Sequence, residues 1–243
     1  DEVYAIAYSA TSYDQYWDKV VLAMHMDDTG LTDLKGHTVT LNGNVARSAT
    51  QSKFGGYSAY FDGDGDWISF PDSTDFTIGT ADFTVEFWVK SAGVNTYAQI
   101  CGQRGSGGAA DAPFGIVRNN AANTMIFNYG NGGSFVYGAT TNAAVFDDAW
   151  HHIACVRAGT RSIVFVDGTL DVEVALPSNF SLYDASSTFS IGRAGEYASS
   201  YFSGYLEDFR FTKGVGRYTA NFTPPASTFV DGMVGGSDNA VIL

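Results

Sequence analysis

The stretch FTVEFWVK, residues 83–90, alternates between two kinds of side chain with a period of two. Successive side chains of a β-strand point to opposite faces of its sheet. One face of this stretch is purely apolar, while the other carries polar groups and a tryptophan: Phe83, Val85, Phe87 and Val89 against Thr84, Glu86, Trp88 and Lys90. The pattern predicts a strand whose apolar face covers a core.

Short stretches of the same kind recur along the chain, and none predicts a helix of three turns. The further strands expected are 20–26, 58–61, 67–70, 125–129, 151–156, 162–166 and 205–211. The pair Asp167-Gly168 favours a type I′ hairpin turn, because both central positions of that turn need a positive φ. Residues 162–166 should therefore pair with 169–175. We expect an all-β protein.

The composition agrees with a globular all-β chain and excludes two classes of partner. The 243 residues include 18 Phe, 14 Tyr and 28 Gly, which suit strands and turns, and this length allows one sandwich with one core. The formal net charge of −13 repels a phosphate backbone, so nucleic acid is not an expected partner. No apolar run approaches the roughly 18 residues of a membrane helix, so membrane insertion is not expected either.

The two ends of the chain have no clear period. Residues 1–19 are expected to form an N-terminal arm and residues 230–243 a C-terminal tail, on either side of a single domain at 20–229. Either end could pack on a neighbouring chain. Because the first residue is Asp rather than Met, we expect a processed chain or a fragment of a longer one.

Four segments in a fixed order carry a resemblance to a known family. They are VVLAMHMDD at 20–28, SKFGGYSAYFDGDGDWISFPDSTDF at 52–76, WHHIACVRAGTRSIVFVDGTL at 150–170 and GYLEDFRFTKGVGRYTANFTPP at 204–225. Together they resemble the laminin-G-like, concanavalin A-like lectin domain. The resemblance implies a two-sheet antiparallel jelly-roll sandwich. Its closing run, TKGVGRYTANFTPP, resembles the end of this domain in tailed-phage virion and prophage tail proteins, which implies a location in a virion.

The resemblance also implies a structural calcium site. Metal sites in laminin-G-like domains often combine carboxylates and carbonyls from segments distant in sequence. The donors implied here are Asp27 and Asp208, which belong to the first and last core strands, with Asp62 as a third. The alternative is that these aspartates make salt bridges or turn hydrogen bonds.

The run Asp62-Gly63-Asp64-Gly65-Asp66 leaves two interpretations open. Three carboxylates within five residues suit a hard cation such as Ca²⁺. The spacing is not that of an EF-hand loop, because its sixth position is Trp67 rather than Gly. The alternative is an Asp/Gly hairpin turn between the strands 58–61 and 67–70, which needs no metal.

No catalytic site is expected. A retaining glycosidase needs two carboxyl groups about 5 Å apart. Asp171 and Glu173 alternate along one strand but have no third acidic partner, while Glu207 and Asp208 are adjacent and should face opposite ways in a strand. We expect Asp171 and Glu173 to be solvated surface groups and the protein not to be an enzyme.

Histidines and cysteines give no metal-binding spacing either. His25, His37, His151 and His152 have no second His or Cys at ligand distance, and we expect them to pack in the core or in turns. Cys101 and Cys155 lie in apolar, strand-like runs. Two free buried thiols are the expected state, with a single disulfide as the alternative.

A sugar site needs exposed aromatic faces beside polar donors. The run from Arg193 to Tyr201 combines these groups in an expected loop, and Tyr129 precedes a glycine-rich turn. We therefore predict that Arg193, Tyr197, Tyr201 and Tyr129 bind a ligand. The alternative is that these aromatic rings pack in the core or at its rim.

The sequence thus favours a non-enzymatic phage virion protein, tail-associated or capsid-decorating, whose lectin-like domain binds glycans. Identical chains or other virion proteins are further expected partners, and a homo-oligomer is the expected state. One alternative is a purely structural assembly domain held by its terminal arms. Another is a secreted, extracellular bacterial carbohydrate-binding module.

Overall fold

The computed structural model describes residues 13–92, 97–105, 111–119, 123–133, 135–193 and 200–232, with only the backbone at 135–138. Within these ranges the chain forms one short 3-10 helix, η1 (Trp17–Lys19), and otherwise only strands. None of the helical structure in these ranges is long and apolar enough to cross a membrane. The expected all-β class is confirmed.

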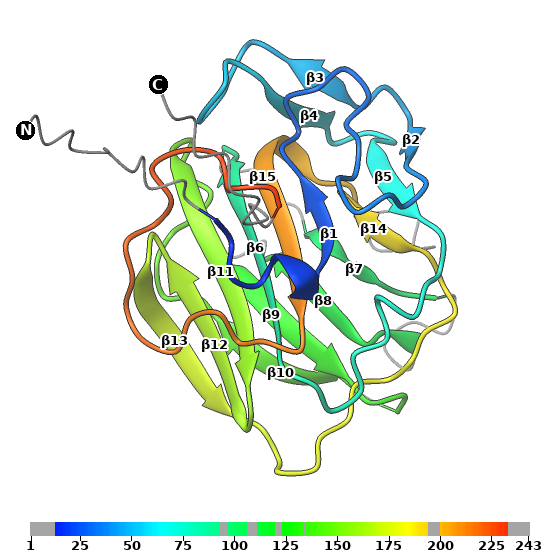
Figure 1. The fold of residues 1–243 in the computed structure, drawn as a ribbon, viewed down its shortest axis with the longest axis vertical. Helices are drawn as coiled ribbons and strands as arrows, with labels where there is room; N and C mark the ends of the chain where they lie inside the picture. The colour runs from blue at the N-terminus through cyan, green and yellow to red at the C-terminus, as the bar shows by residue number, and fades with distance from the viewer. Residues whose placement is uncertain are drawn as a thin grey trace, which may run out of the picture.

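The strands form two antiparallel sheets packed face to face (Figure 1). Sheet A has the order β13-β12-β11-β6-β15-β4-β3, with β1 also paired to β15. Its strands are β1 (Val20–Met24), β3 (Ala46–Ser48), β4 (Ser58–Asp62), β6 (Phe83–Lys90), β11 (Trp150–Ala158), β12 (Arg161–Val166), β13 (Thr169–Ala175) and β15 (Ser203–Lys213). Sheet B has the order β10-β9-β8-β7-β14-β5-β2. Its strands are β2 (Thr40–Asn42), β5 (Trp67–Phe70), β7 (Ala98–Gln103), β8 (Phe114–Arg118), β9 (Met125–Gly130), β10 (Phe135–Thr140) and β14 (Phe189–Ile191).

The core lies between the two sheets and is rich in aromatic rings. Phe83 of sheet A and Phe114 of sheet B have ring centroids 5.1 Å apart, and Phe211 and Phe189 make a similar pair at 5.8 Å. The inner face of β6 is the apolar face expected from its alternation, because its Phe and Val side chains are all in this core. The arrangement is the predicted jelly-roll sandwich.

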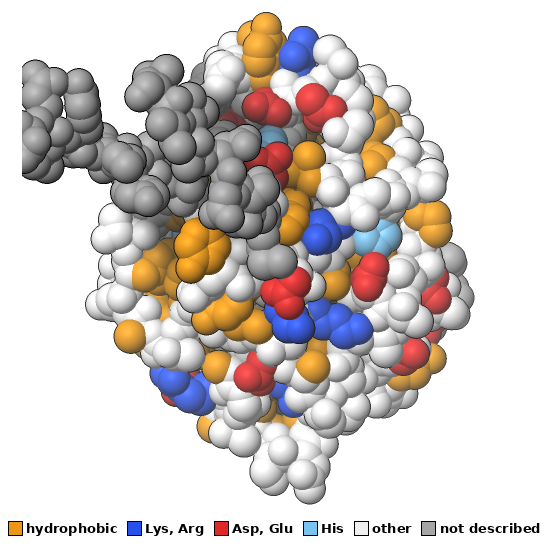
Figure 2. Space-filling model, viewed as in Figure 1, with side chains coloured by type: hydrophobic (Ala, Val, Ile, Leu, Met, Phe, Trp, Pro, Cys, Tyr) orange, Lys and Arg blue, Asp and Glu red, His pale blue; other side chains and the backbone are white. Residues whose placement is uncertain are grey.

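Part of the outer face of sheet A is covered by residues 214–229, which we call the C-terminal strap. It leaves the end of β15 and crosses the front of the sheet (Figure 1). Tyr218 and Phe222 stack at 3.7 Å between ring centroids and pack on Phe165 of β12. The strap contacts the outer side chains of Thr84 and Glu86 of β6, and Phe54 and Lys53 pack on Trp88, so the outer side chains of β6 are buried as well as the inner ones. On this face acidic and basic side chains are interspersed, and apolar groups show between them (Figure 2).

A β-bulge in β15 overturns the prediction that Glu207 and Asp208 face opposite ways. The pairing of β15 with β6 shifts between Glu207 and Arg210, and Asp208 has a φ of 54°. Leu206 and Phe209 both lie in the core, so the two acidic residues between them both project from the outer face. An extra residue on one strand breaks the alternation of side chains.

The run from Asp62 to Asp66 is not the hairpin turn that was one of its two interpretations. Its flanking strands, β4 and β5, belong to different sheets, so the run carries the chain from sheet A to sheet B. Asp66 is fully buried and accepts hydrogen bonds from the backbone N–H groups of Asn44 at 2.7 Å and Asp62 at 3.0 Å. These donors compensate the carboxylate without a metal.

Two local predictions are confirmed. Asp167 and Gly168 have φ values of 50° and 75° and join β12 to β13, which pair as expected. Cys101 and Cys155 are buried free thiols on the facing strands β7 and β11. Burial raises the pKa of both thiols well above the usual value.

Candidate functional site

An aromatic and cationic cluster lies on the outer side of sheet B, at the end of β5. Ile68 and Phe70 of β5 point into the core, so Trp67 points outward and is only half-buried. The Trp67 and Tyr201 rings are 6.0 Å apart with 34° between their planes. The Arg193 guanidinium lies over both rings, 4.3 Å from the centroid of Trp67 and 5.9 Å from that of Tyr201. Such a cluster offers an apolar face beside hydrogen-bond donors.

A row of small and polar residues crosses the same face of sheet B beside Trp67. Each residue of the row pairs with the next on five neighbouring strands: Ser69, Ser190, Gly102, Gly115 and Asn128. Ser69 is two residues along β5 from Trp67, so their side chains share the outward face. We call this row the polar floor.

The polar floor depends on glycine at its centre. Gly102 has a φ of 143°, and a β-carbon there would lie 2.5 Å from the Phe114 carbonyl oxygen. The same β-carbon would lie 2.8 Å from Gln99 Nε2, which places the Gln99 amide directly over the row. Without side chains at Gly102 and Gly115, the surrounding amides and hydroxyls define the chemistry of this face.

Three polar groups at the floor have no hydrogen-bond partner within the part of the chain that the structure describes. They are Gln99 Nε2, Asn128 Oδ1 and Ser190 Oγ, and each is buried. Buried polar groups in proteins are normally paired, and an unpaired one costs about 1–3 kcal/mol. An amide donor, an amide acceptor and a hydroxyl can each pair with an ordered water.

The structure brings two of the four predicted ligand residues together and corrects a third. Arg193 and Tyr201 share the cluster with Trp67, whereas Tyr197 lies outside the described residues. Tyr129 is fully buried in the core, with its ring 4.6 Å from that of Phe127. Burial raises the pKa of its hydroxyl well above the usual value. Tyr129 therefore presents no face to a ligand, and its prediction was wrong.

Trp67 and the polar floor were not predicted from the sequence, although the alternation of side chains gave a signal for Trp67. In WISF the residue Trp67 alternates with Ile68 and Phe70, so period two already places it on the other face from them. The floor had no such signal. Its members are brought together only by the pairing of five strands from distant parts of the chain.

The three aspartates expected to bind calcium do not converge on one site. Asp62 pairs with Ser203 at the start of β15, and Asp208 lies five residues further along that strand, on the order of 15 Å away. Ligands of one calcium ion lie about 2.3–2.6 Å from it, so Asp62 and Asp208 cannot share one. Nowhere in the described ranges do three or more His, Cys, Asp or Glu side chains form a group that could hold a metal ion.

The contacts of Asp208 and Asp62 match the hydrogen-bonding alternative. Asp208 accepts from the backbone N–H of Phe229 at 2.8 Å and pairs with His25 Nδ1 at 2.8 Å. Asp62 accepts from the Asp64 backbone N–H at 2.7 Å and from the Asn44 side chain at 3.1 Å. The predicted set of donors therefore does not fit a calcium ion.

The carboxylates considered for catalysis have structural partners. Glu173 forms a two-point salt bridge with Arg161 at 2.7 and 2.6 Å, and these hydrogen bonds lower the pKa of the Glu173 carboxyl. Asp171 accepts hydrogen bonds from the backbone N–H groups of Asn142 at 2.6 Å and Ala143 at 3.0 Å. A carboxyl with a lowered pKa is a poor general acid at neutral pH, so this pair is poorly suited to glycoside hydrolysis.

Each of the four histidines lies beside a carboxylate. His151 bridges Asp167 at 2.7 Å and Asp147 at 3.0 Å. The others follow the same rule: His37 lies between Asp33 and Asp75, His25 beside Asp208, and His152 beside Glu86. The histidines are thus fixed in turns and packed faces, as expected, through ion pairs that the sequence did not reveal.

A buried ionic cluster fastens the C-terminal strap to sheet A. Arg210 contacts Glu86 at 2.8 Å and Asp14 at 2.9 Å, and Arg217 of the strap contacts Asp14 at 2.7 Å. Burial would raise the pKa of Glu86, but the charge of Arg210 and the contact with His152 lower it well below the usual range. Two carboxylates and two guanidinium groups compensate one another here, so this cluster has a structural role.

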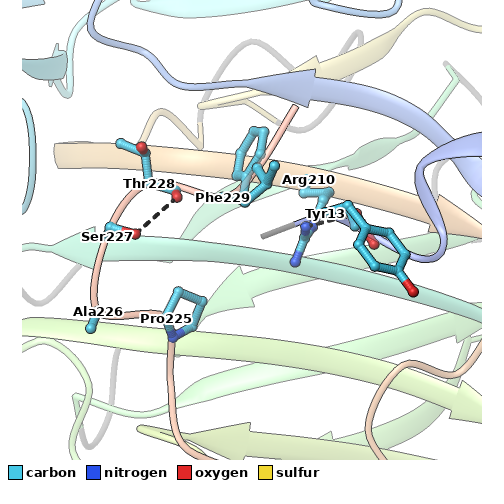
Figure 3. Close-up of a pocket in the computed structure, with 9 residues that line it drawn as sticks. Tyr13, Arg210, Pro225, Ala226, Ser227, Thr228 and Phe229 are labelled. Atoms are coloured by element: carbon cyan, nitrogen blue, oxygen red, sulfur yellow. Dashed lines mark hydrogen bonds and ion pairs between the residues drawn. The ribbon is translucent and has the colours of Figure 1, made fainter. Parts of the chain in front are cut away.

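A cavity of about 240 Å³ lies over this cluster, between residues 225–230 of the chain and Tyr13. Its walls are the chain's own terminal segments, which curve over Arg210 (Figure 3). The Arg210 guanidinium is committed to Asp14 and Glu86, and the remaining walls are the rings of Tyr13 and Phe229 with the segment of residues 225–230. We do not assign it a binding role.

Comparison with known families gives one match. A model of the concanavalin A-like lectin/glucanases superfamily matches residues 62–215, which is more than half of the sequence. No curated protein sequence matches the chain.

Solved structures of the same fold include toxin binding domains. The binding domain of Paraclostridial Mosquitocidal Protein 1 matches 83% of this chain with a TM-score of 0.66 and 12% identity. A structure of botulinum neurotoxin type C, which depends on two ganglioside molecules to get into cells, matches 82% with a TM-score of 0.64 and 11% identity. The ligand-binding domain of botulinum neurotoxin D in complex with N-acetylneuraminic acid matches 83% with a TM-score of 0.61 and 11% identity. This chain covers 51%, 49% and 49% of those chains, so it spans about half their length, and identities this low show the fold alone.

Proposed function

Because the chain belongs to the concanavalin A-like lectin/glucanases superfamily, we propose that it is a lectin-like module that binds glycans and catalyses no reaction. The fold by itself does not decide between binding and hydrolysis, since function depends on the site. The absence of a catalytic role is supported by Asp171 and Glu173, whose carboxylates are held by backbone N–H groups and by Arg161.

The cluster of Trp67, Tyr201 and Arg193 is the observation that carries this proposal. An aromatic face stacks on the C–H surface of a sugar ring, while the guanidinium donates to its oxygens. The polar floor lies beside this cluster, but Gln99, Asn128 and Ser190 are buried, so the three side chains of the cluster carry the proposed contact with the ligand. The toxin domains of similar fold, one of them in complex with N-acetylneuraminic acid, make a glycan the natural class of ligand to test.

A glycan array compared between the wild-type chain and Trp67→Ala tests the proposal. We expect the wild type to bind a defined set of glycans and the variant to lose at least about tenfold in affinity, which corresponds to roughly 1.4 kcal/mol. Mass spectrometry of the bound glycans should find them intact. Cleaved glycans would contradict the non-enzymatic assignment.

Trp17→Ala is the matched control for this experiment. Trp17 is also half-buried and also has a cation over its ring, Lys35 at 4.6 Å, but it packs on sheet A with Phe229. We expect Trp17→Ala to keep wild-type binding. Absence of binding by the wild-type chain to every glycan would contradict the proposal and favour a purely structural assembly domain.

We further propose that the module is displayed outside the cell on a phage virion, as a structural and adhesion component. The support is the resemblance of residues 212–225 to the closing segment of this domain in phage tail proteins. In the fold this segment forms most of the strap, whose Arg217 and Tyr218 contact the ionic cluster. Peptide mass spectrometry of purified virions from the source tests the location, and virions lacking the chain would contradict it. Light scattering of the purified chain tests the expected homo-oligomer.

A further inference from the structure

A second cavity, of about 210 Å³, opens on the outer face of sheet A, away from the Trp67 cluster. It lies where β4, β15 and β6 run side by side, because Tyr205 of β15 pairs with Tyr60 on one side and with Lys90 on the other. These three side chains project from the outer face, opposite the core residues Phe61, Leu206 and Val89. The remaining walls come from Ser91, Asp148 and Ser203.

The two tyrosines form a tilted platform on one side of this cavity. Their ring centroids are 4.9 Å apart with 37° between the planes, and Tyr60 is 37% exposed. Burial raises the pKa of the Tyr205 hydroxyl, and the neighbouring Tyr60 and Asp148 raise it further, which keeps the hydroxyl protonated at neutral pH. The platform therefore presents apolar ring faces and, at Tyr205, a neutral hydroxyl group.

The opposite side of the cavity is polar but has no net charge. Lys90 Nζ forms a salt bridge with Asp148 at 3.0 Å and also donates to the Asp148 carbonyl oxygen. Ser91 Oγ donates to the Ser203 carbonyl at 2.6 Å, which ties the end of β6 to the start of β15. A ligand with a net charge would face both an ammonium and a carboxylate group, whereas hydroxyl groups can pair with both.

The shape of the cavity is fixed by the backbone. Gly204 has a φ of 144°, and a β-carbon there would lie 2.6 Å from the Lys90 carbonyl oxygen and 2.9 Å from Ser91 Cβ. Glycine thus lets β15 approach the end of β6 closely between the two wall residues Ser203 and Tyr205. A cavity on paired strands is largely preformed, which reduces the entropy lost on binding.

We propose that this cavity is a second saccharide site, which binds one neutral pyranose ring against Tyr60 and Tyr205. Its volume of about 210 Å³ is below the roughly 300–1,000 Å³ typical of drug-sized ligands, which suits one ring rather than an oligosaccharide. The ring stacks on the tyrosines, and its hydroxyl groups pair with Lys90 and Asp148. The inference shares its class of ligand with the proposed function but uses none of the same residues, so the chain would hold two sugars on opposite sheets.

Saturation-transfer NMR with neutral methyl pyranosides tests the second site. The probes are methyl α-D-glucopyranoside and methyl β-D-galactopyranoside, with methyl glucuronate as the acidic counterpart. We expect transfer to the ring protons of at least one neutral sugar, and a loss of at least about tenfold in affinity in both Tyr60→Ala and Tyr205→Ala. Lys90→Gln should weaken binding without removing the aromatic platform.

Controls separate this site from the first and from loss of folding. Tyr57→Ala is the matched variant, because Tyr57 is also 37% exposed but packs on Arg47 outside the cavity. Tyr57→Ala and Trp67→Ala should both retain the transfer to the neutral sugar, and near-ultraviolet circular dichroism should show each variant folded. The second site would be overturned if no saturation were transferred to any neutral sugar, or if it were transferred only to the glucuronate. A loss of binding in Trp67→Ala without a loss in Tyr60→Ala would also overturn it. The glycan-array result for Trp67 stands or fails independently of these outcomes.

Discussion

At the scale of single residues, Glu207 shows how a carboxylate is held on the outer face of sheet A. Its two oxygens accept hydrogen bonds from the backbone N–H groups of Lys53 and Phe54, both at 2.6 Å. Burial raises the pKa of Glu207 to about 7, although these N–H donors act in the opposite direction. The side chain therefore fixes residues 52–54, a loop that packs over Trp88 through Phe54 and Lys53.

Replacing Glu207 by glutamine should destabilise the fold. Glutamine is nearly the same size but has one oxygen, so one of the two N–H groups would face an amide NH₂ group and lose its acceptor. We expect a loss of about 1–3 kcal/mol in the free energy of unfolding, measured by urea denaturation at about pH 4.5, because ionisation of a carboxyl whose pKa is raised by folding destabilises the fold and would offset this loss at higher pH. Glu173→Gln, which changes an exposed carboxylate, should have a much smaller effect. Equal losses in the two variants would contradict this role for Glu207.

His151 should make a small part of the stability depend on pH. Burial acts to lower its pKa, but the hydrogen bonds to Asp167 and Asp147 outweigh burial and raise it above the ordinary value of 6.5. A histidine whose pKa is raised by folding stabilises the protein below its unfolded pKa, and this stabilisation is lost as the pH rises through the folded value.

The measurement for His151 is the free energy of unfolding at about pH 5.5 and about pH 8.5, in the wild type and in His151→Asn. The contribution should stay below about 1 kcal/mol, because both aspartates are largely exposed. We expect the variant to lose more stability at the lower pH than at the higher pH. A loss that is the same at both pH values would show that His151 does not titrate in the expected sense.

Period-two alternation predicted individual side chains well in regular strands and failed at the bulge of β15. It placed the outer and inner residues of 83–90 correctly. Applied to MIFNY, it would also have put Tyr129 on the same face as Met125 and Phe127, and hence in the core. Arg193 and Tyr201 were predicted from the composition of the segment 193–201. Composition indicates which kinds of side chain a segment carries but not the face to which each one points.

At the scale of elements, the strap shows that a long segment without regular secondary structure can be a tightly packed part of the fold. It has no strand of its own within the described residues, yet Arg217, Tyr218 and Phe222 bury the outer faces of β6, β11 and β12. The run TKGVGRYTANFTPP that resembled phage proteins forms most of this strap, where Tyr218 and Phe222 pack on sheet A and Arg217 compensates buried charge. The sequence pattern alone marked these residues as a family signature but not as a cover for sheet A.

Arg217→Met should destabilise the protein strongly. It removes one guanidinium group from a buried cluster and leaves Asp14 with less compensation, and breaking a buried ion pair typically costs about 3–5 kcal/mol. Methionine retains much of the side-chain volume, so the effect reports on charge rather than on a cavity. Urea denaturation provides the measurement.

Arg161→Met is the matched control for this change. Arg161 also makes a two-point contact with a carboxylate, Glu173, but both side chains are more than a third exposed. We expect a far smaller loss for this variant, since solvent screens an exposed pair. Similar losses in the free energy of unfolding for Arg161→Met and Arg217→Met would mean that burial does not strengthen the effect of the ionic cluster on stability.

Two elements could not be predicted from local patterns. The bulge in β15 depends on its neighbours, because β15 pairs with β4 before the bulge and with β1 after it. The run from Asp62 to Asp66 has the composition of a hairpin turn, but its flanking strands pair with β15 and β14 instead of with each other. In both cases long-range strand pairing overrides a signal that is only a few residues long.

At the scale of the whole molecule, two sheets share one core and leave both outer faces available for other roles. The strap covers part of one outer face, and the polar floor lies on the other. The formal net charge of −13 made calcium an attractive source of stability. The fold compensates its buried acidic groups internally, through guanidinium groups at Asp14 and Glu86 and backbone N–H donors at Asp66 and Glu207.

This compensation gives a prediction for calcium that concerns the entire fold. Calcium at 100 times its dissociation constant would stabilise the folded chain by about 2.7 kcal/mol. For a chain of this size, 1 kcal/mol shifts the melting temperature by roughly 2–4 °C, so a bound ion would raise it by roughly 5–10 °C. Since Asp62 and Asp208 are too far apart to share an ion, we expect the same thermal midpoint in calcium and in EDTA at matched ionic strength. A rise of several degrees in calcium that disappears in Asp27→Asn would contradict this expectation and would place a site at the end of β1, built from Asp27 and backbone carbonyls rather than from the three aspartates together.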